Sequence, residues 1–327
     1  MPVLRSPCRV RPRRSARVQP QVIVVGDLVL DVVLAPTMPL VAGSDVPGRV
    51  LIRQGGSATS TARWLGRLGA RSALVCAVGR DSAARALIAA ATADRVDVHA
   101  VRVTGSHTGR IGVVVEPDGE RSFIQDRAAA LRLRPDDLRA AWFSGADAVH
   151  LPVYTLLDEP LGQAGMAAIG LAREAGALVS VDLASSEPLQ ALGRRASVAL
   201  VREAAPDVLF TNRDEAAALV GPDREARLLE LTPVAVIKRG GKGVTVLARQ
   251  HDPGAEGHLR FEVATRTIRA PDTTGAGDAF DAGFLTGWLD ARRRGLAPAA
   301  ALQRGAVVGN RTALRHLANP PGELNLG

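Results

Sequence analysis

The chain has 327 residues, of which 46% are hydrophobic and 23% are charged. This composition can bury a sizeable core and excludes a wholly disordered chain. The two cysteines, Cys8 and Cys76, form no C-x-x-C motif, and no uncharged apolar run is long enough to span a membrane. We therefore expect a cytoplasmic protein without a disulfide scaffold, a cysteine-based zinc site or a membrane partner.

The formal net charge of +8 is concentrated at the N-terminus. Residues 1–20 contain six arginines and no acidic residue, so residues 21–327 carry a charge of only +2. The first 20 residues lack the apolar core of a secretory signal. A transit peptide or a nucleic-acid-binding arm would also be rich in arginine. We interpret residues 1–20 as a disordered basic tail and expect no nucleic-acid partner.

Residues 21–327 are predicted to form one α/β domain in which strands and helices alternate. Short apolar runs predict buried strands, and longer segments between and after them predict helices. This alternation indicates a mostly parallel sheet with helices on both faces, a three-layer fold. The predicted strands are 21–27, 73–78, 148–151, 178–183, 208–210 and 234–237, and the predicted helices are 57–68, 81–93, 135–143, 156–175, 188–202, 214–220, 277–294 and 298–317.

Two segments interrupt this alternation. Residues 108–124 read as a β-hairpin around the turn Pro117-Asp118-Gly119. Residues 32–52 lack helical periodicity and contain several prolines and glycines. We expect the segments of about 32–54 and 105–126 to form a small sheet outside the main body. A lid over an active site is the functional interpretation, and a hairpin packed on the core is the structural alternative.

A glycine-rich turn precedes the predicted helix 277–294. Gly275 and Gly277 permit positive φ angles and a close backbone approach. The aromatic side chains Phe280, Phe284 and Trp288 then follow at helical spacing and predict a buried stripe. The N–H groups of residues 275–277 would therefore lie at a helix N-terminus, where unpaired donors and the helix dipole bind anions.

Asp278 lies in the first turn of the same predicted helix. A carboxylate at this place can take a proton from a hydroxyl nucleophile while the neighbouring N–H groups bind the anion under attack. These are the requirements of phosphoryl transfer to an alcohol. The alternative interpretation is a helix start in which Asp and Thr act only as caps.

The string Asp-Thr-x-Gly-Ala-Gly-Asp-x-Phe, residues 272–280, resembles signature two of the ribokinase-like (PfkB-type) carbohydrate kinase family. The resemblance extends over about residues 21–318. It implies a ribokinase-like fold with a β-sheet lid and an activity that moves the γ-phosphoryl group of ATP to a hydroxyl of a small sugar-like acceptor. It also implies that Asp278 is the catalytic base and that Gly275, Ala276 and Gly277 form the anion hole.

Further motifs resemble the family's substrate-binding segments. Gly26-Asp27 with Asp31 matches the first-strand segment, whose carboxylate binds sugar hydroxyls in the family. Gly55-Gly56 is similar to the start of signature one, although Ser60 replaces the family's Asn. In the Gly-x-Asp-x-x-Gly motif that usually follows, Ala84 replaces the last Gly. The resemblance therefore implies an acceptor site formed by Asp27, Asp31, Gly55, Gly56 and Ser60.

The resemblance also implies an ATP site. Asn212-x-x-Glu215 is similar to the family motif that is associated with Mg²⁺ and phosphate, and Glu215 would hold Mg²⁺ through water. Asn212 and Glu215 could instead form a simple capping box. A monovalent cation such as K⁺ is a further candidate cofactor. The predicted ATP-binding residues are Asn212, Lys238, Gly240, Gly243, Thr273 and Asn310.

The resemblance leaves the acceptor open. The sequence contains neither a P-loop nor a dinucleotide-binding glycine motif. Aromatic residues are only 3% of the chain, which favours a sugar over a nucleoside because few side chains can stack on a base. A nucleoside or hydroxymethyl-heterocycle kinase and a non-catalytic sugar-sensing protein are the alternatives. A homodimer that forms through the lid is the expected assembly.

Overall fold

The computed structural model describes residues 19–118, 120–250, 257–268, 270, 272–320 and 322–324. Most of the predicted tail, residues 1–18, lies outside the described residues. The last two residues of the predicted tail contact the body: the carbonyl of Pro20 accepts a hydrogen bond of 2.9 Å from the Arg71 amide, and Arg293 donates to the carbonyl of Gln19. The folded body therefore includes residues 19 and 20.

A nine-stranded sheet forms the middle layer, in the order β13-β12-β11-β10-β9-β8-β1-β4-β5. Its strands from β5 to β11 pair in parallel, whereas β12 and β13 pair antiparallel at one edge. The predicted mostly parallel sheet is confirmed, and β5, β12 and β13 were not predicted. The bounds are β1 Gln21–Val25, β4 Arg71–Val78, β5 Val96–Arg102, β8 Ala148–Pro152, β9 Leu178–Asp182, β10 Val208–Asn212, β11 Val234–Lys238, β12 Val244–Arg249 and β13 His258–Val263.

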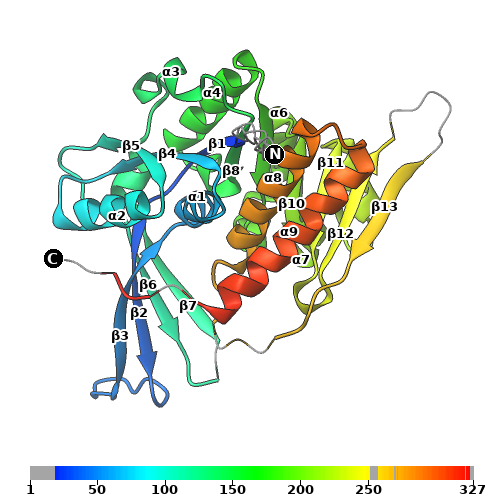
Figure 1. Cartoon of the computed structure of the whole chain (residues 1–327). Helices are drawn as coiled ribbons and strands as arrows, with labels where there is room; N and C mark the ends of the chain where they lie inside the picture. Colours follow the sequence, from blue (N-terminus) through cyan, green and yellow to red (C-terminus); the bar gives the residue numbers. More distant parts are fainter. Residues whose placement is uncertain are drawn as a thin grey trace, which may run out of the picture.

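Helices cover both faces of this sheet because successive side chains of a strand point to opposite faces. Val22 and Val24 of β1 belong to the core under α1, α2, α8 and α9, whereas Ile23 and Val25 belong to the core under α4, α6 and α7. Figure 1 shows α8 and α9 side by side in front of the sheet. The bounds are α1 Ser57–Arg67, α2 Ser82–Ala93, α4 Leu161–Glu174, α6 Arg194–Ala204, α7 Arg213–Val220, α8 Ala276–Arg293 and α9 Pro298–Ala318.

Three predicted helices differ from the structure. The prediction for 135–143 was wrong, because a 3₁₀ turn at Pro135–Asp137 and the single turn α3, Ala140–Phe143, replace one helix. The predicted helix 188–202 is split into α5, Ser186–Leu192, and α6 by Gly193, whose φ of 84° lies outside the helical region. The helix predicted from residue 156 begins at Leu161 instead.

A smaller sheet of order β3-β2-β6-β7 projects from the body (Figure 1). Its strands are β2 Val29–Pro36, β3 Gly48–Gly55, β6 Arg110–Val115 and β7 Arg121–Asp126. The predicted hairpin is confirmed by the antiparallel β6–β7 pair, and the separate small sheet is confirmed as well. Because β2 follows β1 after only a few residues, the small sheet stands at the carboxyl end of the central strand.

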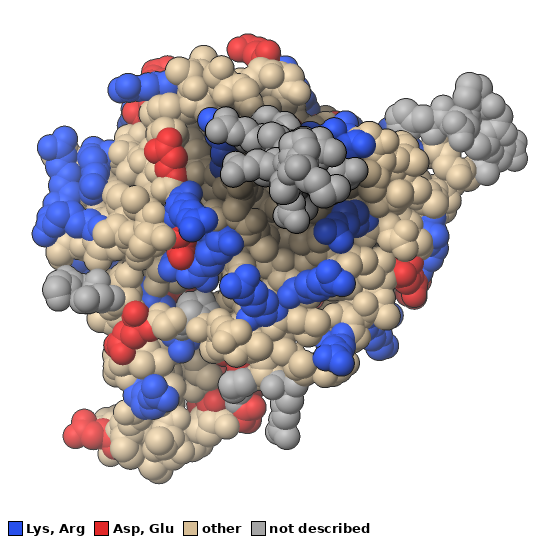
Figure 2. Space-filling view, in the orientation of Figure 1, with Lys and Arg blue, Asp and Glu red and all other residues tan. Residues whose placement is uncertain are grey.

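Charged side chains of both signs are visible on the face of the molecule that carries α8 and α9 (Figure 2). Figure 2 shows Lys and Arg side chains spread over the face that carries α8 and α9, mostly separated by uncharged surface. Among the described residues, no helix has both the length and the apolar character that a membrane span requires.

Candidate active site

A large cavity of about 1440 Å³ lies between the small sheet and the carboxyl ends of the main strands. Asp27 follows β1, Asp182 ends β9, Asn212 ends β10 and Lys238 ends β11, and all four line this cavity. Ligands of open α/β sheets bind at this edge because the loops between parallel strands and helices converge there. The fold thus collects residues that are far apart in the sequence.

The glycine-rich turn borders the cavity at the start of α8. Gly275 has a φ of 81° and is the N-cap residue, and both Gly275 and Gly277 line the cavity. The predicted contribution of Ala276 is not supported, because its N–H donates to the carbonyl of Thr273 at 3.2 Å and the residue does not line the cavity. Of the three predicted donors, those of Gly275 and Gly277 are therefore the ones available to an anion.

Asp278 is held beside these glycines. The hydroxyl of Ser57, at the start of α1, donates a 2.7 Å hydrogen bond to its Oδ1. Burial raises the pKa of Asp278 to about 7, against the opposing effect of that hydrogen bond. A carboxylate whose pKa lies near neutrality is suited to accept a proton from an alcohol and to release it again.

Lys238 places a positive charge beneath the same turn. Its Nζ lies 2.9 Å from Asp182 and 3.3 Å from Asp281, and a Cβ at Gly277 would lie only 3.3 Å from this nitrogen. Burial by itself lowers the pKa of Lys238, but the two carboxylates outweigh it and raise that pKa above its ordinary value. Lys238 is therefore a cation close to Gly277.

His316 of α9 fixes the turn from the other side. The indole N–H of Trp64 donates to His316 Nδ1 at 3.1 Å, so Nε2 carries the proton of the neutral ring. Nε2 lies 2.6 Å from the carbonyl oxygen of Thr274 and therefore donates to it. A Cβ at Gly275 would lie 3.0 Å from His316 Cε1, so the glycine allows the ring to approach.

This contact predicts a role for His316 in turnover. The kcat of the His316→Ala variant should be lower by a few-fold to about tenfold, which corresponds to the free energy of one hydrogen bond. The reason is that the Thr274 carbonyl is no longer held by the imidazole. Trp64→Phe keeps the packing, loses the N–H donor and should have a smaller effect. Steady-state kinetics and melting curves measure both variants. A lower melting temperature with an unchanged kcat would show that the contact is only structural.

The predicted acceptor residues lie together at the base of the small sheet. Asp27, Asp31, Gly55, Gly56 and Ser60 all line the cavity. A Cβ at Gly55 would lie 1.8 Å from an Asp31 side-chain oxygen, so a side chain there would displace this carboxylate. A Cβ at Gly56 would lie 2.6 Å from the backbone carbonyl of Asp27, so this position requires glycine. Burial, together with the Asp27 charge, raises the pKa of Asp31 to about 7. The two carboxylates thus form a pair of acceptors for hydroxyl groups.

Two arginines of the small sheet reach the glycine-rich turn. Arg53 of β3 and Arg121 of β7 bind opposite oxygens of Asp272 at 2.9 and 3.0 Å. Arg121 also donates to the hydroxyl of Thr274 at 2.6 Å. Both outer strands of the small sheet are therefore connected to the turn that carries Gly275 and Gly277.

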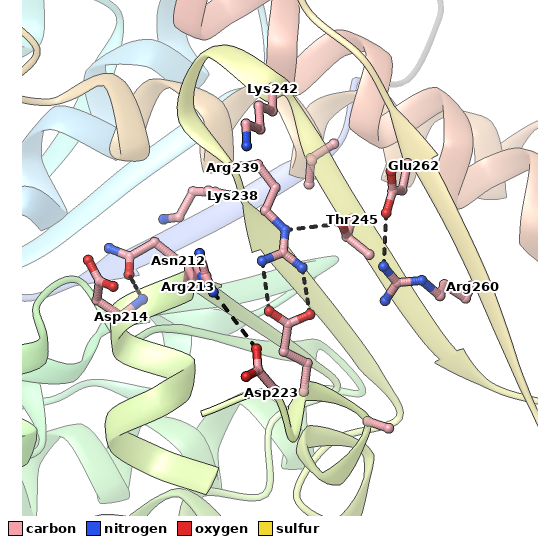
Figure 3. A pocket seen from close by; sticks show the side chains of 13 residues that line it. Asn212, Arg213, Asp214, Asp223, Lys238, Arg239, Lys242, Thr245, Arg260 and Glu262 are labelled. Atoms are coloured by element: carbon pink, nitrogen blue, oxygen red, sulfur yellow. Dashed lines mark hydrogen bonds and ion pairs between the residues drawn. The ribbon is translucent and has the colours of Figure 1, made fainter. Parts of the chain in front are cut away.

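A second cavity of about 880 Å³ shares Asn212 and Lys238 with the first. Figure 3 shows Arg239 beside Thr245. The guanidinium of Arg239 binds both oxygens of Glu225, at 2.7 and 2.5 Å. Lys242 points into the same space (Figure 3). This polar cavity therefore adjoins the larger one at Asn212 and Lys238.

Asn212 and Glu215 form the capping box that the sequence left as an alternative. Asn212 Oδ1 accepts from the amide of Glu215, and the Glu215 carboxylate accepts from the Asn212 amide at 2.7 Å. Burial raises the pKa of Glu215 to about 7. Within the described residues, no three acidic, His or Cys side chains form a metal-ligand set. Lone pairs that remain on Glu215 fit a water-mediated contact to Mg²⁺.

Three residues predicted to bind ATP do not line either cavity. Asn310 donates to the carbonyls of Val263 and Ala264 and braces the chain after β13. A Cβ at Gly243 would lie 2.1 Å from the Val263 carbonyl, so this glycine is needed for packing. These two residues and Thr273 line neither cavity, whereas Lys238 and Gly240 line the larger one.

The family model for pfkB family carbohydrate kinases matches residues 19–323 of this chain. The chain belongs to this family. An ATP-dependent ribose-1-phosphate kinase of Halopiger xanaduensis is 34% identical over 72% of this chain and 73% of its own length. A fructokinase of Klebsiella pneumoniae is 30% identical over 81% of this chain and 83% of its own. The solved structure of an adenosine kinase from Sinorhizobium meliloti covers 94% of this chain and 97% of its own, with 24% identity and a TM-score of 0.78.

The pfkB kinase site contains residues that the sequence analysis missed. Asp281 follows Asp278 by three positions and interrupts the apolar stripe of α8, a signal that was available in the sequence. His316 and Asp182 were not among the predicted site residues. Arg53, Arg121 and Arg127 carried no local signal, because their partners are distant in the chain.

Proposed function

We propose that this carbohydrate kinase moves the γ-phosphoryl group of ATP to a hydroxyl of a small, neutral, sugar-like acceptor. The observation that carries the proposal is one cavity in which a carboxylate of raised pKa, the anion-binding glycines and a pair of hydroxyl acceptors meet. The residues concerned are Asp278, Gly275 and Gly277, and Asp27 with Asp31.

Each group has a distinct part in this reaction. Asp27 and Asp31 accept hydrogen bonds from acceptor hydroxyls and orient the sugar. Asp278 takes the proton of the attacking hydroxyl as the new O–P bond forms and the bond to the ADP oxygen breaks. Gly275 and Gly277 bind the transferred phosphoryl oxygens, and nearby Lys238 adds positive charge. Mg²⁺, when bound with ATP, shields the phosphate charges, and Glu215 would hold it through water.

The names of the relatives suggest which acceptors to test. Fructokinase relatives favour a ketohexose, and the ribose-1-phosphate kinase relative offers a phosphorylated pentose as the competing choice. A nucleoside or hydroxymethyl-heterocycle acceptor is the second candidate of the same fold. A sugar sensor without catalysis is not favoured. The use of ATP agrees with a cytoplasmic location, which we propose as well.

ATP consumption with an acceptor panel tests this function. The panel contains D-fructose, D-ribose, ribose 1-phosphate, adenosine and a hydroxymethylpyrimidine, each with MgATP in K⁺ and in Na⁺ buffer. We expect acceptor-dependent ADP formation with a neutral sugar, and the K⁺ arm tests the proposed monovalent cation. Binding of a sugar without ADP formation would instead identify a sensor.

The raised pKa of Asp278 predicts the acid limb of the pH profile. Because the base must be deprotonated, kcat should rise with pH through about 7. Ser57→Ala removes a hydrogen bond to the carboxylate, so the pKa should rise further and the limb should move to higher pH. Ser82→Ala, outside both cavities, is the control. If the acid limb of Ser57→Ala lies at the same pH as that of the parent, Asp278 is not the catalytic base.

The outer surface of the small sheet, defined by Leu34, Val50 and Ile124, supports a homodimer through the lid. These side chains are 38%, 63% and 70% exposed and lie on the surface that faces away from the cavity. A second copy packed here would remove them from water. We expect a dimer by light scattering, and a Val50→Glu/Ile124→Glu variant should be a monomer. Leu296→Glu, an exposed leucine elsewhere, should not change the mass.

A further inference from the structure

Arg127 lies at the base of the small sheet, directly after β7, and forms part of the wall of the large cavity. Only 9% of the residue is exposed. Its Cζ lies 5.3 Å from the centre of the Tyr154 ring, over which the guanidinium stacks. A Cβ at Gly109 would lie 2.7 Å from the Arg127 carbonyl, so the backbone is closely packed too. The guanidinium is therefore held at one place in the cavity wall.

The neighbours of this guanidinium leave one of its nitrogens without a hydrogen bond. Nη2 lies 3.6 Å from Asp27 Oδ2, and Nη1 lies 3.8 Å from Asp158 Oδ2. Both distances exceed those of hydrogen bonds. Nη2 is buried and has no hydrogen-bond partner among the described residues. A buried charged donor without a partner is costly, so a bound oxygen from outside the chain would complete this site.

We propose that Arg127 determines acceptor specificity by donating to a hydroxyl oxygen of a neutral sugar, next to the hydroxyl that donates to Asp27. This inference rests on the proposed function. A carboxylate only accepts hydrogen bonds and a guanidinium only donates them, whereas a hydroxyl group does both. Hydroxyls on neighbouring carbon atoms of a sugar are thus complementary to the adjacent Asp27 and Arg127 side chains.

The surrounding charge favours a neutral group over an anion at this position. Asp27 and Asp158 flank the guanidinium, and Asp31 and Asp278 line the same cavity. A phosphate or carboxylate group bound to Arg127 would lie close to Asp27, and the repulsion would weaken the attraction of the guanidinium. Sugars with an anionic substituent at this position should therefore bind poorly.

Replacement of Arg127 tests the assignment with D-fructose as the probe, or with the neutral sugar that the parent uses best. Arg127→Gln should raise the KM and the calorimetric Kd of this acceptor by about 10- to 100-fold, and the KM of ATP should not change. The KM and Kd of the acceptor for Arg127→Lys should lie between those of the parent and of Arg127→Gln, because lysine keeps the charge and lacks the planar guanidinium. Arg49→Gln, a small-sheet arginine outside the cavity, is the matched control.

Single-deoxy analogues of the acceptor then identify the hydroxyl. The analogue that lacks this hydroxyl should bind the parent enzyme weakly. Its affinity should fall little further in Arg127→Gln, because removal of the hydroxyl and removal of the guanidinium abolish the same interaction. Unchanged acceptor binding in Arg127→Gln, or additive losses for every analogue, would overturn the proposal while the kinase function stands. The proposal would also be overturned if the parent enzyme prefers ribose 1-phosphate and Arg127→Gln no longer binds ribose 1-phosphate. A parent that phosphorylates no hydroxyl acceptor contradicts the proposed function, and the assignment of Arg127 with it.

Discussion

Asp278→Asn should lose at least about 100-fold in kcat, because a general base contributes on the order of 10²–10⁴-fold. The amide keeps the size of the side chain and can still accept the hydrogen bond from Ser57. It lacks the basicity that removes the proton of the attacking hydroxyl. Steady-state kinetics measure the loss, and calorimetry with ATP·Mg²⁺ should show nucleotide binding close to that of the parent.

A capping role for Asp278 predicts a different pattern. A carboxylate that only complements the helix dipole in the first turn would cost about 0.3–1 kcal/mol of stability when it is neutralised, with near-normal turnover. Asp290→Asn, at the far end of the same helix and paired with Arg294, is the matched control for loss of a charge. A folded Asp278→Asn enzyme whose kcat stays within a few-fold of the parent would falsify the assignment of the base.

Asp27→Ala should raise the KM of the acceptor about tenfold or more, the expected cost of losing a charged hydrogen-bond partner. The KM of ATP should be unchanged, because Asp27 lies at the end of the cavity under the small sheet. Initial-rate kinetics with each substrate varied in turn separate the two constants.

The Asp27 side chain also has a structural contact, which needs its own control. Its Oδ1 accepts a 3.3 Å hydrogen bond from the Ala58 amide at the start of α1. Asp27→Asn keeps an oxygen that can accept from this amide and loses only the charge. It should therefore fold like the parent, and its affinity for the acceptor should be reduced, as in Asp27→Ala. If either variant loses affinity for ATP and keeps affinity for the acceptor, the two substrates occupy opposite ends of the cavity from those proposed.

The sequence by itself determined the features that depend on neighbouring residues. The alternation of apolar runs and helical segments predicted the mostly parallel sheet, because each element follows from its own periodicity. The string at 272–280 predicted a helix N-terminus after a glycine-rich turn, since Gly275 provides the positive φ that the turn requires. Gly193 shows where local prediction was incomplete, because its own φ divides a segment that otherwise reads as one helix.

The tertiary structure alone decided which side chains meet in the site. Lys238 lies 56 residues from Asp182 and 43 residues from Asp281, and Arg53 binds Asp272 across 219 residues. Such contacts leave no local pattern in the chain, because the order of the strands in the sheet and the projection of the small sheet bring the partners together. The same reason explains why His316 and Arg127 became visible only after folding had placed one beside Gly275 and the other beside Asp27.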